Sequence, residues 1–482
     1  MTPRPYSPRE YQPLGTDHIS EHRRCALWAG MGMGKGVMAL TALSQLELTE
    51  EVWPALAIGP LRVARDVWTR EPQKWDHLAH IHTSAVIGDE DARRRALKVE
   101  APLYSINYEN LEWLIEYVGT DRWPFRTIIA DESRKLQGYR GSYRTHPKSG
   151  KVFLQGAGGT RARALAKVAH ERTSRFIELT GRPAPNGLTD LWAQAWFLDR
   201  GERLGRTYEG FVRRWFRPKY DGYGVEPLQG AEAEIHARLK DVCLTLDPKD
   251  WFDLREPIVN DVYVELPPAA RKLYREMEKD LFIQLEGATV EAFGAAAKSQ
   301  KCLQLANGAV YIDPEAADDR DPRAKKWKAV HDAKIEALES VISEHDGSPM
   351  MIVYSFRSDL ARIKKLLPKA IDLSEQANEL AFKRGGIDYG ICHPDSLGHG
   401  VDGMQQVCYT ITHFGHGWSL DSYDQINERI GPVRQIQAGF DRAVRINHIL
   451  ARDTLDEDVM ERRVSKRSVQ DILLAAMNRR RR

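Results

Sequence analysis

Short apolar runs alternate with amphipathic segments along much of this chain. Apolar runs that end in polar or glycine-containing turns predict buried strands, and helical spacing of apolar residues predicts the segments between them. The predicted strands lie at residues 25–28, 55–58, 103–108 (where the strand runs into a loop), 127–130, 350–356 and 389–394, with one more in the loop-bounded stretch that begins at residue 179. The predicted helices lie at residues 37–46, 266–285 and 334–342. Such alternation is typical of α/β proteins whose sheets are mainly parallel.

A glycine-rich turn, Ala29-Gly-Met-Gly-Met-Gly-Lys35-Gly36, joins the first strand to the first helix. This order indicates a phosphate-binding loop, because glycines let backbone N–H groups curl round an anion and the helix N-terminus adds positive charge. The expected phosphate contacts are Gly30, Gly32, Gly34, Lys35 and Gly36. The pattern GxxxxGK[ST] is altered at both ends, since Ala29 replaces a glycine and Gly36 replaces the hydroxyl residue that holds magnesium. Taken alone, the stretch could also be an ordinary glycine-rich turn.

The strand at residues 127–130 ends in two acids, Asp131 and Glu132. Downstream of a phosphate loop, this pair is typical of a nucleotide-hydrolysing site. We expect Asp131 to hold Mg²⁺ through water and Glu132 to orient and deprotonate the attacking water. Gln12 precedes the loop, and its amide could hydrogen-bond an adenine edge, although a surface role is the simpler alternative for Gln12 alone.

The composition describes a globular protein of two or three domains, with 482 residues, 42% hydrophobic and 29% charged. Lys and Arg number 70 and Asp and Glu 68, so any binding of nucleic acid must come from local clusters. Five cysteines without a CxxC pair predict a reduced, cytosolic protein. A signal peptide and a membrane-spanning run are both missing, so we expect a soluble intracellular protein. Histidines at 77, 80 and 82 lack the cysteine or carboxylate cluster that would complete a metal site.

Basic residues interleaved with aromatic ones occur in two stretches. Arg62 opens the first, which also carries Trp68 and Trp75, and Arg213 and Arg214 lie in the second, at residues 203–219. Such stretches can hold nucleic-acid phosphates. The alternative is an amphipathic surface helix for the first stretch and salt bridges to the other lobe for the second.

The motifs of the first half stand in the order of superfamily 2 helicases. They are Gln12, the loop ending at Lys35, Gly59-Pro60-Leu61, Asn107-Tyr108, Asp131-Glu132-Ser133-Arg134 and Leu179-Thr180-Gly181-Arg182-Pro183. Their details resemble the Swi/Snf-type branch of DNA translocases, especially the compact bacteriophage forms. Gly-Pro-Leu followed by Trp68 and Trp75, and Thr-Gly-x-Pro with Asn186, are specific to that branch. The acidic tetrad is Asp-Glu-Ser-Arg where many relatives have Asp-Glu-Ala-His.

The second half continues the resemblance. Ser396 and Gly398 match the family pattern Ser-x-Gly-x-Gly, and Asp402 stands where relatives often have Asn. The pattern Gln-x₃-Arg-x₂-Arg-x₂-Gln is matched at Gln425, Arg429 and Gln435, whereas its second arginine position is Pro432 and Arg434 is the candidate substitute. An arginine suits the γ-phosphate because its charge is fixed and its fork is planar. A helix C-terminus capped by arginines is the alternative.

The resemblance implies two tandem RecA-like lobes, at residues 1–200 and 331–482, joined by a helical, basic insertion at residues 201–330. It implies a DNA-dependent ATPase that translocates on double-stranded DNA with ATP and Mg²⁺. Its ATP site would lie between the lobes and use Gln12, Gln425, Arg429 and Arg434 with the loop and the acidic pair. Its DNA contacts would be Arg62, Asn107, Tyr108, Arg182, Arg213, Arg214, Ser396 and Gly398. We expect a monomer in the cytoplasm, of the host cell if viral, with a phage replication or nuclease protein as a possible partner.

Two alternatives remain open at this stage. One is a helicase that separates strands of DNA or acts on RNA. The other is a clamp that binds ATP and DNA with little hydrolysis, which the departures at Gly36 and Pro432 would favour. The outcome depends on whether Thr41, Ser44 or water replaces the lost magnesium ligand.

Overall fold

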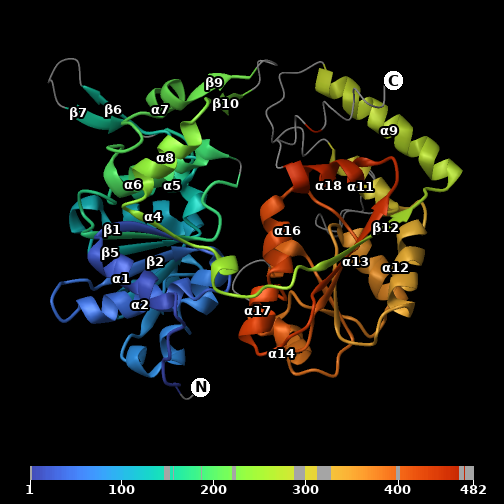
Figure 1. Ribbon diagram of the computed structural model, residues 1–482, viewed down its shortest axis with the longest axis horizontal. Coiled ribbons are helices and arrows are strands. Elements are labelled where there is room, and N and C mark those ends of the chain that lie inside the picture. The colour runs from blue at the N-terminus through green and yellow to red at the C-terminus, as the bar shows by residue number, and fades with distance from the viewer. Residues whose placement is uncertain are drawn as a thin grey trace. The chain divides into compact units, whose positions relative to one another are not determined.

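The computed structural model describes residues 3–145, 152–155, 157–185, 187–219, 224–286, 299–311, 327–397, 402–465 and 472. Contacts divide the chain into two compact units, Met1–Phe252 and Asp253–Arg482 (Figure 1). The stretch at 201–330, expected as an insertion, contributes to both units, since one of its strands joins each of the two main sheets.

Seven parallel strands form the main sheet of the first unit, in the order β11-β1-β8-β5-β2-β4-β3. They are β1 (Arg24–Ala29), β2 (Ala55–Gly59), β3 (Thr83–Ala85), β4 (Leu103–Asn107), β5 (Thr127–Asp131), β8 (Arg175–Thr180) and β11 (Cys243–Leu246). Its helices are α1 (Gln12–Glu21), α2 (Lys35–Leu46), α3 (Glu90–Lys98), α4 (Leu111–Val118), α5 (Thr160–Ala166), α6 (Leu191–Asp199), α7 (Tyr208–Trp215) and α8 (Ala231–Leu239). Short hairpins pair β6 (Ser142–Thr145) with β7 (Val152–Gln155) and β9 (Phe216–Pro218) with β10 (Val225–Pro227). Since the seven strands are parallel, their carboxyl ends lie along one edge of the sheet.

Alternating residues of this sheet enter two separate hydrophobic cores. Ala26 and Trp28 of β1 belong to one core, which includes residues of α4 to α8, and Leu27 belongs to the other, which includes residues of α1 and α2. Strand β5 divides in the same way, with Ile128 on the first face and Ile129 on the second. A sheet covered on both faces explains why its strands are continuous apolar runs.

The second unit repeats this design with six parallel strands in the order β12-β19-β18-β15-β17-β16. They are β12 (Ile258–Val264), β15 (Met350–Val353), β16 (Ile371–Asp372), β17 (Tyr389–Cys392), β18 (Thr410–His413) and β19 (Arg445–Ala451). The helices are α9 (Pro268–Glu286), α11 (Gln300–Ala306), α12 (Ala333–Ser343), α13 (Arg357–Leu366), α14 (Gln376–Lys383), α15 (Pro394–Leu397), α16 (Leu420–Asn427), α17 (Pro432–Gln437) and α18 (Leu455–Ser465). A small hairpin pairs β13 (Ala309–Tyr311) with β14 (Trp327–Ala329).

The expected fold class is confirmed, because each unit has a parallel sheet covered by helices on both faces. The strands that the apolar runs predicted are present, and the helices predicted at 266–285 and 334–342 appear as α9 and α12. Among the described helices, none combines the length and the apolar character needed to cross a membrane.

A buried ion pair ties together the helices of the second unit. Lys334 of α12 lies 2.6 Å from Asp456 of α18, and both side chains are fully buried. The same ammonium donates to Asn307 Oδ1 at 2.8 Å, and Asn307 Nδ2 donates to Asp359 of α13. The pair therefore belongs to a polar network that spans three helices.

We predict that Lys334→Ala destabilises the second unit by about 3–5 kcal/mol, because Asp456 would stay buried without its counter-charge. The free energy of unfolding, measured in urea, checks this. Lys364→Ala is the matched control, since Lys364 lies on the exposed side of α13 and its loss is expected to change stability by no more than about 0.5 kcal/mol. An equal loss in the two variants would contradict the prediction.

Candidate nucleotide and nucleic-acid site

The phosphate loop lies between β1 and α2, as the sequence predicted. Gly32 and Gly34 have φ values of 81° and 80°, in the left-handed region that favours glycine. A Cβ on Gly34 would lie 2.6 Å from Nε2 of Gln12, so no larger residue fits here without movement. Lys35 Nζ donates to the carbonyl oxygens of Ala29 at 2.8 Å and Gly30 at 3.2 Å. The lysine thus folds back over its own loop, within reach of any anion held there.

Gln12, at the start of α1, packs directly against this loop. Its side-chain oxygen accepts from the backbone N–H of Arg9 at 2.9 Å, and its Nε2 donates to the carbonyl oxygen of Met33 at 3.4 Å. Only 8% of Gln12 is exposed. Gln12, expected to contact adenine, therefore lies against the glycine-rich loop at Met33 and Gly34.

The two candidate hydroxyls that could replace the missing magnesium ligand point elsewhere. Thr41 Oγ1 lies 2.9 Å from His77 Nε2, and Ser44 Oγ donates to Glu47 at 3.4 Å. A Cβ on Gly36 would meet no heavy atom nearer than Glu71 Cγ at 3.7 Å. The space that a hydroxyl side chain would fill is therefore open to a water molecule.

Asp131 ends β5 beside the loop, in a half-buried position. Burial and the neighbouring Glu132 carboxylate raise the pKa of Asp131 to about 7, while Lys35 and a hydrogen bond from Trp68 act against them. Trp68 Nε1 donates to Asp131 Oδ2 at 3.1 Å. Tyr108, which is fully buried, donates its hydroxyl to the carbonyl oxygen of Asp131 at 3.0 Å. Trp68 thus fixes the carboxylate and Tyr108 fixes the backbone of Asp131. More positive charge near the carboxylate would favour its ionised form.

Glu132 holds an uncommon backbone conformation, with φ 58° and ψ 51°. Few residues with a Cβ adopt this left-handed region, because the Cβ approaches the following carbonyl oxygen. Arg134 Nε donates to Glu132 Oε2 at 3.1 Å, and both side chains are largely buried. The strained turn aims the Glu132 side chain, and Arg134 holds it.

The loop after β8 lies against the phosphate loop. A Cβ on Gly181 would lie 3.4 Å from the Ala29 carbonyl oxygen and 3.7 Å from the Met31 nitrogen. Arg182 is exposed, and its backbone N–H donates to Thr180 Oγ1 at 3.2 Å. This loop thus contacts the phosphate loop, while Arg182 is exposed.

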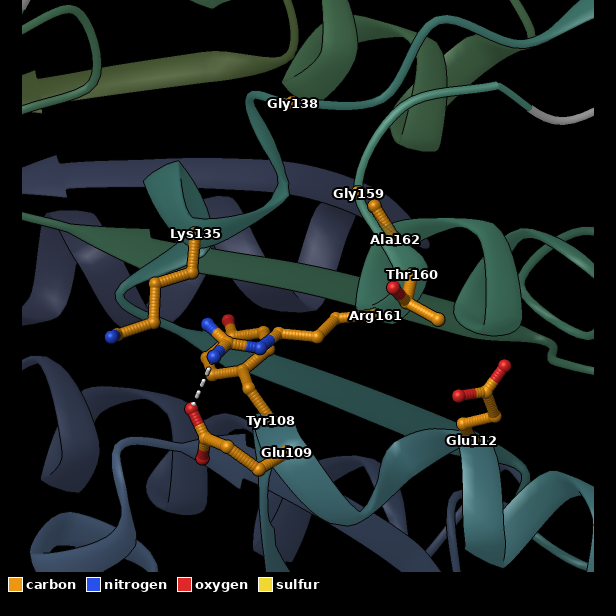
Figure 2. Close-up of a pocket in the computed structure, with 9 residues that line it drawn as sticks. All are labelled: Tyr108, Glu109, Glu112, Lys135, Gly138, Gly159, Thr160, Arg161 and Ala162. Atoms are coloured by element: carbon orange, nitrogen blue, oxygen red, sulfur yellow. Dashed lines mark ion pairs between the residues drawn. The ribbon is translucent and has the colours of Figure 1, made fainter. Parts of the chain in front are cut away.

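A pocket of about 410 Å³ opens beside Tyr108, at the same edge of the sheet. Figure 2 shows Arg161 of α5 reaching over Tyr108 toward Glu109, with which it pairs at 2.9 Å, while Lys135 enters from the turn after β5. Burial lowers the pKa of Lys135. Asn107, expected to contact DNA, is only 5% exposed and donates instead to Glu109 at 2.9 Å. The pocket beside the Asn-Tyr motif is thus lined by Tyr108 of the motif and by the cations Arg161 and Lys135.

The other basic candidates of the first unit lie on its surface. Arg62 is partly buried before the turn that carries Trp68. Arg213 and Arg214 lie on the exposed side of α7, whose Phe211 and Trp215 face the core. Arg214 pairs with Glu234 of α8 at 2.9 Å, so this stretch is an amphipathic helix with an ion pair inside its own unit.

In the second unit, Gln425 and Arg429 lie together on α16 and the turn that follows it. Gln425 Nε2 donates to Asp421 Oδ1 at 3.0 Å, and Arg429 Nε donates to the Gln425 carbonyl oxygen at 3.2 Å. Gln435, the matching glutamine, is buried and donates to Cys408 and Ile430 carbonyl oxygens at 3.0 and 2.9 Å. Hydrogen bonds of Gln425 and Gln435 thus anchor this motif segment within the second unit.

Arg434 has a partner that the sequence did not reveal. Its guanidinium forms an ion pair with Asp402, the residue that stands where relatives often have Asn. Ser396, on α15, donates to the His393 carbonyl oxygen at 2.8 Å. Gly398 lies outside the described residues.

The three nearby histidines have separate partners. His77 contacts Thr41, His80 lies 2.9 Å from Glu47, and His82 lies 2.9 Å from the Glu100 carbonyl oxygen. Among the described residues, no group of three or more His, Cys, Asp or Glu side chains is arranged to hold a metal ion.

We predict that Glu132→Gly is more stable than Glu132→Ala by about 1 kcal/mol, because glycine tolerates the left-handed conformation that alanine resists. Both variants lack the carboxylate, so urea unfolding compares the backbone alone. The same pair at Gln137, where φ is −54°, provides the control and should give the opposite order. A more stable Glu132→Ala would show that the turn is not strained.

The chain has relatives along its whole length. It is 47% identical over 481 residues to protein p41 of Acyrthosiphon pisum secondary endosymbiont phage 1, covering 98% of this chain and 99% of that protein. It is 23% identical to nuclear protein STH1/NPS1 of Saccharomyces cerevisiae over 97% of this chain, and 21% identical to the uncharacterized ATP-dependent helicase MG018 of Mycoplasma genitalium over 89%. The chain spans about a third of these last two proteins, 35% and 38% of their lengths.

Two other comparisons complete this picture. No family model matches the chain. The Sulfolobus solfataricus SWI2/SNF2 ATPase core in complex with dsDNA aligns over 97% of this chain and 93% of its own, at 19% identity and a TM-score of 0.43. A structural match at this TM-score does not support a family assignment. The assignment rests on the sequence relatives and on the order of the motifs. On those grounds the chain belongs to the Swi/Snf family of superfamily 2 helicases, in the compact form that also occurs in bacteriophages.

Proposed function

We propose that this chain is an ATP-driven motor that translocates on double-stranded DNA. The observation that carries the proposal is the meeting of Lys35, Asp131 and Gly181 at one edge of the first sheet, although they are far apart in sequence. Family membership supports ATP hydrolysis, and the relative MG018 is named as an ATP-dependent helicase.

The residues present fit ATP with Mg²⁺. We propose that the loop glycines and Lys35 hold the phosphates, that Gln12 contacts the adenine, and that Asp131 holds Mg²⁺ through water. Bound Mg²⁺ would neutralise charge on the phosphates. The open space beside Gly36 supports water as the replacement for the missing hydroxyl. The positive charge of the metal would also oppose the burial that raises the pKa of Asp131.

Glu132 is the proposed general base. Its carboxylate is held by Arg134, and its strained backbone turns the side chain away from the path of β5. Because a base must be aimed as well as ionised, this restraint suits a residue that orients a water molecule.

Arg429 is the proposed arginine that neutralises charge on the γ-phosphate, with Gln425 as its neighbour in the same motif. Arg434 was expected to assist, but its ion pair with Asp402 gives it a structural role in this arrangement. We therefore assign the principal catalytic effect to Arg429.

The DNA contacts proposed for the first unit are outward-facing or pocket-lining cations. A DNA phosphate could be contacted by each of Arg182, Arg213 and the pocket residues Lys135 and Arg161. Tyr108 would act indirectly, because its hydroxyl donates to the Asp131 carbonyl oxygen. Arg62 and Arg214 are secondary candidates, and Ser396 with Gly398 would serve in the second unit. A phage context suggests a role in replication or genome processing in the host cytoplasm, with the chain acting as a monomer or with a nuclease partner.

We predict that duplex DNA strongly stimulates ATP hydrolysis and that Lys35→Ala and Glu132→Gln each reduce it to background. The assay compares duplex DNA, single-stranded DNA, RNA and no nucleic acid. Stimulation by single strands or RNA alone would favour the strand-separating alternative. Binding of ATP and DNA without hydrolysis would mean that the chain is a clamp, and near-normal activity in either variant would falsify the site assignment.

We predict that Arg429→Ala lowers kcat by about 10³-fold, within the range known for such arginines, and that Arg434→Ala lowers it less than about 10-fold. The affinity for ATP, measured by titration with a fluorescent ATP analogue, should change little in both variants. Asp402→Ala serves as the matched control for Arg434, since it removes the other half of the same ion pair. A larger loss for Arg434→Ala than for Arg429→Ala would reverse the assignment.

A further inference from the structure

One buried side chain, Gln194 of α6, joins the turn after β5 to the loop after β8. Ser133 Oγ donates to Gln194 Oε1 at 3.0 Å. Gln194 Nε2 donates to the carbonyl oxygens of Pro183 at 2.6 Å and Asp190 at 3.2 Å. Gln194 is 1% exposed and Ser133 is fully buried. Both ends of the amide are thus satisfied by protein groups.

The surroundings of Gln194 favour an apolar residue. Residues 191–198 of α6 are all buried, and Trp192, Ala193, Ala195 and Trp196 belong to the first hydrophobic core. An amide in such a place is costly to bury unless its hydrogen bonds are satisfied. Its partners are therefore the feature that distinguishes this position from the rest of the helix.

Two of those partners adjoin functional residues. Ser133 directly follows Glu132, the proposed base, and Pro183 directly follows Arg182, a proposed DNA contact. Ser133 also stands where many relatives have alanine, so the hydroxyl that Gln194 binds is a departure from the common tetrad. Gln194 bonds both segments. A shift of the turn after β5 or of the loop after β8 would therefore stretch a hydrogen bond of Gln194 and act on the other segment through it.

We propose that Gln194 is a positioning residue that couples DNA contact at the Arg182 loop to the orientation of Glu132. This rests on the proposed function, since it assumes that DNA stimulates hydrolysis. A DNA phosphate bound to Arg182 restrains the loop after β8, and with it the Pro183 carbonyl oxygen that Gln194 bonds. Gln194 in turn restrains Ser133, and therefore the turn that orients Glu132. Coupling of two sites through one element requires that removing the element changes their linkage and not merely each site.

The test is a double-mutant cycle in the full chain, with Ser133→Ala, Gln194→Met and the double variant. Ser133→Ala leaves Gln194 Oε1 without its donor, whereas Gln194→Met removes the acceptor of Ser133 and the donor to the Pro183 and Asp190 carbonyl oxygens. The double variant removes both members of the Ser133–Gln194 pair, so only the loss of the two carbonyl contacts remains in it. Three quantities are measured for each protein: the midpoint of urea unfolding, the KM for ATP, and kcat with and without saturating duplex DNA.

We expect each single variant to lose stability, and the double variant to lose less than the sum of the two losses. The stimulation of kcat by duplex is expected to fall at least about 5-fold in all three, with the KM for ATP within about 2-fold of wild type, because the link is absent in each. Thr173→Val is the control, since the Thr173 side chain is buried and its hydroxyl donates to the Val168 carbonyl oxygen, away from the site loops. It should lose stability and keep its stimulation.

A double variant that regains wild-type stimulation together with its stability would overturn the proposal, because Gln194 would then serve packing alone. Unchanged stimulation in the single variants would overturn it as well. If duplex DNA does not stimulate ATP hydrolysis by the wild-type chain, the proposed function is overturned, and the coupling role of Gln194 with it. Lys35→Ala in the same assay shows which hydrolysis belongs to this chain.

Discussion

The parallel direction of every strand in the first sheet is the constraint on which the site depends. Parallel strands end at the same edge, so the turns after β1, β5 and β8 lie together although up to about 150 residues separate them. Helices on both faces bury the sheet, which leaves this edge as the place where polar loops can meet. The acid, the lysine and the Thr-Gly loop are neighbours because of the topology and not because of their own sequence.

The sequence predicted the parts that follow simple patterns. Continuous apolar runs marked β1, β2, β4, β5 and β15, because strands buried on both faces carry few polar residues. It missed β18 and β19, whose His413 and His448 interrupt the apolar run. Both histidines are buried and bonded, His413 to Asn427 at 2.8 Å and His448 to Asp261 at 2.7 Å. Partners from distant elements make such polar residues compatible with a core, and no local pattern reports them.

In the candidate site, too, the sequence predicted the residues but not the partners that depend on the fold. Lys35, Asp131 and Gln12 were predicted from motif order and lie together. Trp68 was noted as a family feature, but its hydrogen bond to Asp131 depends on a fold contact that the sequence does not display. Tyr108 was expected to face DNA and instead fixes Asp131 from the core, since its ring is fully buried. A motif indicates that a residue matters more reliably than it indicates which way the side chain points.

Two residues that depart from the family pattern bond side chains on other elements of the fold. Ser133 replaces an alanine and binds Gln194, while Asp402 replaces an asparagine and pairs with Arg434. In each case one unusual polar residue is matched by a second one on a different element, which removes the cost of leaving either group unsatisfied. Gly36 differs, since nothing in the described structure fills the space beside it except the stem of Glu71. A departure that is compensated by protein adds a contact between two elements, whereas one left open to solvent leaves its space to water.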